Sequence, residues 1–334
     1  MESITHIVLG AAMGDVMAGK KIGKKAMLIG AIAQSLPDFD FIACIWMPPD
    51  QYFLAHRGLT HSFLFVLLAS LLLPFAVNYF ESIRLKRQKW VLFFSTQLLT
   101  HILLDSLNAY GVAWLEPFSH QRLSFDVLFV ADPIFTIWPF IACVVLLFLK
   151  ASSNARWKWA ITGILLGCIY IVYAMSNKSK VIHEVETSLE EQRIPTQDFL
   201  ITPTPLNTWL WFIVAKSNDG YWIGYYSDFD RKPITYHYLS RNDSLLSPQQ
   251  LANVETNRLM RLSREYYHFT QKGDTIVFSN LRFGQIFGWE NPEAPFVFQY
   301  YLGKPNSLFT VQRGRFSDWD RTRLENFIRR IKGN

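Results

Sequence analysis

The sequence predicts a polytopic α-helical membrane domain over residues 1–178, followed by a smaller soluble α+β domain over residues 179–334. Two observations support this division. Apolar runs with the length of a membrane span, which is about 20 residues, occur only in the first half. The second half reads as an ordinary soluble sequence, in which aromatic and β-branched runs alternate with turn residues.

The apolar runs, taken in order, define the expected helices of the first domain. A run rich in small residues, 4–17, comes first, and lysines follow it, so we expect no signal peptide there. Pro37 breaks the next run, 26–47, because proline removes a backbone donor and disfavours helix in the residue before it. Four further runs are expected to span a membrane: residues 63–80, 90–110, 133–149 and 159–175.

The basic residues of the first domain predict its orientation. They gather in three clusters at the ends of apolar runs, 20–25, 84–89 and 150–158, and lysine and arginine favour the cytoplasmic side of a membrane. The net charge of +6 is modest and lies largely at these ends, so we expect no nucleic-acid partner. Alternation of the spans puts these segments on the outer side: His6, residues 56–61, residues 111–132, and everything after Asn177, which makes the second domain extracytoplasmic.

Patterns in the second half predict a compact α+β domain. Residues 208–215 and 221–226 flank an Asn-Asp-Gly turn, which indicates a β-hairpin. Ser247 followed by Pro248 predicts a helix that runs to residue 267, since serine caps helices and proline suits their first turn. The remaining expected elements are an acidic amphipathic surface helix or linker at 183–193, strands near 275–279, 296–301 and 308–312, and a last helix that runs from a Ser317-Asp318 cap to residue 331.

Acidic and imidazole side chains recur inside or beside the apolar runs of the first domain. Buried polar groups are unfavourable by several kcal/mol each unless they are paired or bind a metal. His101 and Asp105 are four residues apart and therefore share one face of a helix. The mixed ligand types suit Zn²⁺, with Mn²⁺ or Fe²⁺ as alternatives, and would serve one or two ions. The candidate ligands are His6, Asp38, Asp40, His56, His61, His101, Asp105 and Asp132.

The segment His56-Arg57-Gly58-Leu59-Thr60-His61-Ser62 carries further chemistry. Arg57 cannot bind a metal, but its guanidinium can hold a phosphate or a developing negative charge, or pair with Asp38 or Asp40. Asp40 or Asp105 is the expected general base, and Thr60 is expected to orient an imidazole. The three cysteines lack CxxC spacing and are expected to be core residues. A structural network of paired polar groups remains the alternative explanation of these residues.

These motifs together resemble the YdjM/YfhP-type family of bacterial inner membrane proteins, whose members are usually called membrane-bound metal-dependent hydrolases. The resemblance covers residues 1–175. It implies a membrane core in the inner membrane, with a metal site built from those histidines and aspartates. Some relatives carry a histidine where this chain has Phe41, so a ligand present in them would be missing here. The second domain resembles the extension of the longer YfhP-type members. The motifs that carry the resemblance are His6, Pro37-Asp38-Phe39-Asp40, the segment from His56 to Ser62, His101 with Asp105, and Asp132-Pro133.

The leading hypothesis is a membrane-embedded hydrolase in which metal-activated water attacks an ester or phosphoester of a lipid or lipid-linked substrate. An alternative from another class is a membrane scaffold whose polar network is structural and whose outer domain binds a partner. A third hypothesis, a metal or proton transporter, predicts ligands over the full depth of the bilayer. The candidate ligands instead gather towards one side, which counts against transport.

Overall fold

The computed structural model describes the whole chain except residues 1, 46, 48–54, 81–84 and 303–318. The chain divides into two compact units, one that reaches to Ala174 and one that begins at Met175. The division falls inside a long helix, α7 (Ala155–Glu191), which therefore contributes to both units.

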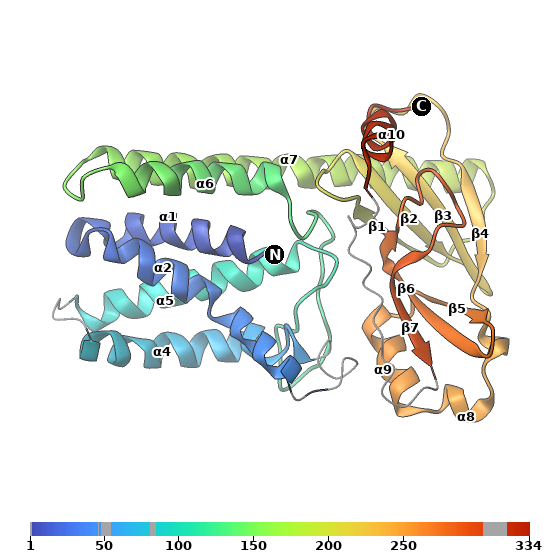
Figure 1. Cartoon of the computed structure of the whole chain (residues 1–334), viewed down its shortest axis with the longest axis horizontal. Helices are drawn as coiled ribbons and strands as arrows, with labels where there is room; N and C mark the ends of the chain where they lie inside the picture. Colours follow the sequence, from blue (N-terminus) through green and yellow to red (C-terminus); the bar gives the residue numbers. More distant parts are fainter. Residues whose placement is uncertain (1, 46, 48–54, 81–84, 303–318) are drawn as a thin grey trace. The chain divides into compact units, whose positions relative to one another are not determined.

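Helices that lie alongside one another make up the first unit (Figure 1). The pairs in contact are α1 with α2, α1 with α6, α2 with α5, and α4 with α5. The elements are α1 (Ser3–Ile22), α2 (Lys25–Ser35), the 3-10 helices η1 (Pro37–Ile45) and η2 (Leu59–His61), α4 (Phe63–Phe80), α5 (Arg87–Ser106), α6 (Pro133–Phe148) and the first part of α7.

Glycines allow α1 and α2 to pack against each other closely. A Cβ atom on Gly14 would lie 2.2 Å from the carbonyl oxygen of Ala26, and one on Gly30 would lie 2.1 Å from that of Gly10. A side chain at either position would therefore push the two helices apart. The glycines thus permit a close contact between the backbones of α1 and α2.

Pro37 ends the second helix, as its sequence predicts. Helix α2 stops at Ser35, and η1 starts at Pro37 with Asp38 and Asp40 in its first turn. The tighter 3-10 winding continues the chain after a residue that cannot supply a backbone donor. Both aspartates thus follow directly from a helix that packs against α5.

The prediction of a polytopic membrane domain is wrong. Among the described residues, α7 alone is both long and apolar enough to cross a membrane. The apolar stretches of α4 and α6, Phe63–Val77 and Pro133–Phe148, are shorter than the ~20 residues that a span needs. Helix α5 has 20 residues, but charged side chains such as Lys89 and Asp105 interrupt it. The alternation of spans, on which the predicted orientation depended, therefore loses its basis.

Two antiparallel sheets form the centre of the second unit, with strand orders β1-β2-β3-β4 and β5-β6-β7. Val181, Val185 and Leu189 repeat every four residues on α7 and pack on Trp211 and Ile213 of the first sheet. The elements are β1 (Asp198–Pro203), β2 (Leu210–Lys216), β3 (Gly220–Ser227), β4 (Tyr236–Ser240), η3 (Asp243–Leu245), α8 (Pro248–Leu251), α9 (Val254–Ser263), β5 (Tyr267–Lys272), β6 (Thr275–Gln285), β7 (Phe296–Leu302) and α10 (Arg321–Ile331).

The predicted hairpin is confirmed, whereas the predicted helix after it is not. Strands β2 and β3 pair antiparallel, with Lys216 opposite Tyr221 across the turn. The helix expected to run from Ser247 to residue 267 is two helices, because Asn253 caps the start of α9 with a hydrogen bond to the backbone of Glu255. Residue 267 belongs to β5 instead.

Further expectations for the second unit are either wrong or concern residues that the structure does not describe. The acidic segment 183–193 is the end of α7, whose apolar face is buried, and not a separate surface helix or linker. The last helix, α10, has Asp320 as its N-cap. The expected strand at 308–312 and the expected Ser317-Asp318 cap lie outside the described residues.

Candidate metal centre

Four side chains from three elements of the first unit converge on one point. Asp38 comes from η1, His61 from η2, and His101 and Asp105 from α5. One ligand atom of each lies within 4.8 Å of a ligand atom of every other residue, and we call these four residues the ligand cluster. The two histidines and Asp105 are fully buried, and Asp38 is partly exposed.

Distances within the ligand cluster match the size of a tetrahedral metal site. His61 Nε2 and His101 Nε2 are 3.1 Å apart. His61 Nε2 lies 3.5 Å from both Asp38 Oδ1 and Asp105 Oδ2, and His101 Nε2 lies 3.6 Å and 3.8 Å from the same two oxygens. Ligand atoms about 2.1 Å from a tetrahedral ion are ~3.4 Å from one another.

Hydrogen bonds on the outer side of each imidazole determine which ring nitrogen carries the proton. His101 Nδ1 lies 2.5 Å from the backbone carbonyl oxygen of Gln34, which only accepts, so Nδ1 donates. Thr60 Oγ1 donates to Asp40 Oδ2 at 2.8 Å and therefore accepts from His61 Nδ1 at 3.0 Å. Both Nε2 atoms consequently turn lone pairs towards the centre of the ligand cluster.

This arrangement of acceptors fits a bound cation. Two nitrogen lone pairs and two carboxylate oxygens repel each other unless a positive charge lies between them. An imidazolium would supply that charge, but burial lowers the pKa of His61 to about 3. A divalent metal ion accepts electron pairs from all four residues, and neutral imidazole with carboxylate is a donor set that Zn²⁺ uses.

Asp40 lies behind His61, outside the ligand cluster. Its Oδ1 accepts a hydrogen bond from His56 Nδ1 at 2.7 Å, and its Oδ2 accepts one from the backbone of Arg57 at 3.1 Å in addition to that from Thr60. Burial alone would raise the pKa of Asp40, but the hydrogen bond from His56 and the neighbouring imidazoles lower it overall. A carboxylate in this place orients a ligand imidazole. His56, a predicted ligand, is thus held on Asp40.

Arg57 supplies a buried positive charge next to Asp105. Its Nε lies 3.1 Å from Asp105 Oδ2, and its Nη1 donates to Asn108 Oδ1 at 2.8 Å. The guanidinium also lies 4.9 Å from the ring centroid of Tyr110. A backbone φ of +62° puts Arg57 in the left-handed region, which is unfavourable for a residue with a side chain. The Arg57 side chain pairs with Asp105, whereas the sequence indicated Asp38 or Asp40 as its alternative partner.

His6 and Asp132, the two remaining predicted ligands, are not part of the ligand cluster. His6 Nε2 is 3.2 Å from Asp105 Oδ1, and the His6 ring stacks on that of His101 with centroids 3.9 Å apart, so His6 reaches the ligand cluster through Asp105. Asp132 caps α6, because its Oδ1 accepts from the backbone of Ile134 at 2.9 Å and its Oδ2 accepts from the Tyr170 hydroxyl at 3.0 Å. The structure does not bring Asp132 to the ligand cluster.

Sequence reasoning missed three partners of the site. Asn108 and Tyr110 hold Arg57, and both are polar residues that follow α5 within one or two turns of Asp105, a signal that could have found them. The Gln34 carbonyl orients His101 as a backbone group, which no sequence pattern identifies. Asp15 lies outside the site, where its Oδ1 accepts a hydrogen bond from Arg156 Nε at 3.1 Å.

Comparison with known families now identifies the chain. The family model described as "YdjM inner membrane protein" matches residues 1–181, which is more than half of the sequence and includes the whole ligand cluster. The chain belongs to the YdjM family. The resemblance inferred from the motifs is therefore confirmed.

Two individual proteins are also similar to this chain. The inner membrane protein YbcI of Escherichia coli (strain K12) is 34% identical over 121 residues, which cover 36% of this chain and 69% of that protein. The uncharacterized protein YfhP of Bacillus subtilis (strain 168) is 25% identical over 246 residues, which cover 70% of this chain and 73% of that protein. No solved structure matches the chain.

Membership of the YdjM family has a direct consequence for location. The family and YbcI are described as inner membrane proteins, so the location of this chain is the inner membrane. Helix α7 has the length and composition to enter that membrane. The expectation of an inner membrane protein with a group of residues able to hold a metal is thus supported on both counts.

Proposed function

We propose that this YdjM-family protein is a metal-dependent hydrolase that acts on an ester or phosphoester of a lipid or lipid-linked substrate. The observation that carries the proposal is the pair of imidazole lone pairs that meet two carboxylates at one centre. Asp38, His61, His101 and Asp105 would hold Zn²⁺, and their donors also suit Mn²⁺ or Fe²⁺. Bound there, such an ion would acidify water and polarise the bond to be broken.

The pair of His56 and Asp40 is the best placed to move a proton. Asp40 Oδ1 accepts from His56 Nδ1 at 2.7 Å, which orients the imidazole and leaves Nε2 as the nitrogen that can take a proton. The His56 side chain is 23% exposed, whereas those of His61 and His101 are 0% exposed. Only an accessible imidazole exchanges protons readily with water. The proposal therefore gives His56 the role of general base and Asp40 a positioning role.

Arg57 and His6 position Asp105 from two sides. Arg57 Nε lies 3.1 Å from Asp105 Oδ2, and His6 Nε2 lies 3.2 Å from Asp105 Oδ1. The carboxylates of Asp38 and Asp105 would balance a divalent ion, and a third carboxylate, Asp40, lies behind His61, but the Arg57 guanidinium places one positive charge directly beside Asp105. That charge favours the negative charge that develops on an ester or phosphoester oxygen in the transition state.

The inner membrane location of the family supports a lipid or lipid-linked substrate. The flanks of α7 support an extracytoplasmic second unit. Three basic residues, Lys150, Arg156 and Lys158, lie before the apolar part of α7, and two, Lys178 and Lys180, lie directly after it, so the excess of basic residues that favours the cytoplasm is on the first flank. A reporter enzyme that is active only in the cytoplasm should therefore be inactive when it is fused to the C-terminus.

The experiment that tests the proposal measures metal content and hydrolysis in the same preparations. Zinc-loaded protein is mixed with vesicles of isotopically labelled bacterial lipids, and released products are identified by mass spectrometry. The His101→Ala variant should lose both metal and turnover, and His56→Ala should keep the metal but lose turnover. His120→Ala, which changes an exposed loop histidine bound to Glu116, is the matched control and should keep both.

Each outcome has a definite meaning. A His101→Ala chain that binds as much metal as the wild type overturns the metal centre. A wild-type chain that binds metal but releases no product from any lipid overturns the hydrolase and leaves a structural metal. Wild-type turnover in His56→Ala removes the general-base assignment alone.

A further inference from the structure

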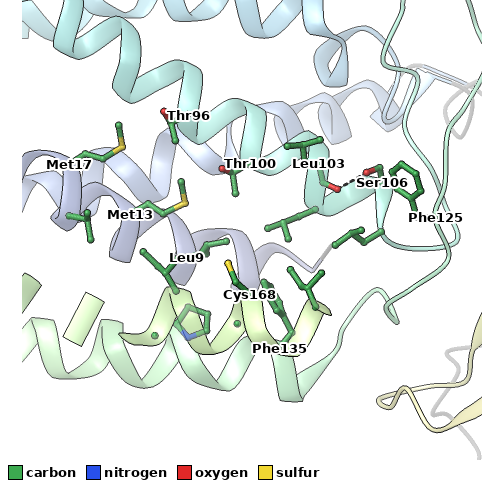
Figure 2. A pocket seen from close by; sticks show the side chains of 18 residues that line it. Leu9, Met13, Met17, Thr96, Thr100, Leu103, Ser106, Phe125, Phe135 and Cys168 are labelled. Carbon is green, nitrogen blue, oxygen red and sulfur yellow. Dashed lines mark hydrogen bonds between the residues drawn. The ribbon is translucent and has the colours of Figure 1, made fainter. Parts of the chain in front are cut away.

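A cavity of about 520 Å³ lies in the first unit between α1, α5, α6 and α7 (Figure 2). None of the four residues of the ligand cluster lines it, so it is distinct from the candidate metal centre. Residues that line it from the four helices include Leu9, Met13 and Met17 of α1, Leu103 of α5, Phe135 of α6 and Cys168 of α7.

The walls of this cavity are mostly apolar, since only Thr96, Thr100 and Ser106 of its 18 lining residues carry a hydroxyl. The Thr96 hydroxyl donates to the backbone oxygen of Leu92 at 2.8 Å, and the Ser106 hydroxyl donates to that of Leu103 at 2.5 Å, as Figure 2 shows for the second pair. Both protons are thus used within α5. Ordered water needs two to four polar partners, and apolar cavities without them stay dry. Protein interiors also contain few voids larger than a water molecule. The ligand that fits is therefore apolar.

The form of the cavity indicates a long, thin ligand. Its lining on α5 runs from Thr96 to Ser106, which is about 15 Å at the rise of an α-helix. Met13 and Met17 line it one turn apart on α1, and their unbranched side chains adapt to a flexible neighbour. Cys168 lines the cavity and is itself exposed, so the cavity opens beside α7.

We propose that this cavity binds one hydrocarbon chain of a membrane phospholipid. The inner membrane location of the family makes such chains the apolar ligands at hand. Leu103 is two residues from both His101 and Asp105, so it points to the opposite side of α5 from the ligand cluster. The cavity and the candidate metal centre therefore lie on opposite sides of α5, and an α-helix with its side chains is about 10–12 Å across. We identify this phospholipid as the substrate of the proposed hydrolase, and in this respect the inference rests on the proposed function.

Photolabelling tests the proposal. The full chain is reconstituted in vesicles that contain phosphatidylethanolamine with a diazirine near the end of one acyl chain, and adducts are mapped by mass spectrometry after irradiation. Labelling should centre on Met13, Met17 and Cys168 and should saturate as the probe fraction rises. Cys168→Trp, which fills the opening, should reduce labelling of the two methionines tenfold or more, since affinity falls about fourfold for each methylene displaced. Ile169→Trp, at an exposed neighbour outside the cavity, is the matched control and should leave labelling unchanged.

Labelling that rises linearly with probe in the wild type, or that is equal on outward-facing residues, overturns the proposal without any variant. Equal labelling of the methionines in Cys168→Trp and Ile169→Trp also overturns it. The His101→Ala chain separates this inference from the proposed function. Labelling of that variant at the wild-type level shows that the cavity binds the hydrocarbon chain without a metal. If the wild-type protein is labelled but hydrolyses no lipid, the proposed function alone is overturned.

Discussion

Replacement of Thr60 by valine tests the arrangement behind His61 without touching a ligand. Valine has the shape of threonine but lacks the hydroxyl. In the wild type that hydroxyl donates to Asp40 Oδ2 at 2.8 Å and accepts from His61 Nδ1 at 3.0 Å. The variant therefore removes the contact that makes Nδ1 the protonated nitrogen and leaves Nε2 for the metal.

The expected effect can be estimated from the neighbouring atoms. Loss of a partner of a metal-bound histidine weakens metal binding ~10–100-fold, which corresponds to ~1.4–2.7 kcal/mol. Asp40 Oδ2 lies 3.6 Å from His61 Nδ1 and can move into hydrogen-bond range, so it replaces part of the lost contact. We therefore expect a zinc Kd about tenfold higher in Thr60→Val, at the lower end of that interval.

Competition titration against a chromogenic zinc chelator measures this Kd in detergent-solubilised protein. Thr136→Val is the matched control, because its hydroxyl bonds Thr5 and the Asp132 backbone, outside the ligand cluster, and its Kd should equal that of the wild type. An unchanged Kd in Thr60→Val, or an equal increase in both variants, would refute the reasoning about the His61 proton.

The pKa shift and the packing around the ligand cluster lead to three more expectations. Burial lowers the pKa of His61 to about 3, below its unfolded value of about 6.5, so the unfolded chain binds more protons between these values. In thermal unfolding of metal-free protein, the contribution of His61 to the free energy of unfolding should be fully present above pH 6.5 and should decline by up to ~5 kcal/mol on acidification towards pH 3. A wild-type chain that loses no more stability on acidification than His61→Gln would contradict this. Asp132→Ala should lower the free energy of unfolding by ~1–2 kcal/mol, because the α6 cap is lost. Elemental analysis should find its metal content unchanged, whereas loss of metal would show that Asp132 is a ligand. Gly14→Ala should destabilise by ~1–3 kcal/mol in the same unfolding assay, because its Cβ would lie 2.2 Å from the Ala26 oxygen, whereas the exposed Thr162→Ala should not.

Local patterns in the sequence predicted those parts of the structure that local forces determine. The break at Pro37 follows from the covalent chemistry of proline, and the β2–β3 hairpin follows from its turn residues. His101 and Asp105 share a helix face because of their spacing. All four residues of the ligand cluster are among the eight predicted ligands.

The division of roles among those eight residues depends on tertiary contacts. Whether an aspartate binds a metal, supports a histidine or caps a helix depends on which elements meet it, and the sequence does not show this for Asp40 or Asp132. Strands β1, β4 and β5 were not expected, since a strand is stabilised by the partner beside it. The membrane prediction failed because composition alone shows an apolar run, whereas a span also needs a sufficient uninterrupted helix.

X-ray absorption spectroscopy of the zinc-loaded protein tests the central claim most directly. The account predicts one ion per chain with two imidazole nitrogens and two carboxylate oxygens at about 2.0–2.2 Å, and loss of one nitrogen ligand in His61→Ala. A spectrum of zinc surrounded by water alone, or one that is the same in His61→Ala and the wild type, would contradict a metal centre built from Asp38, His61, His101 and Asp105.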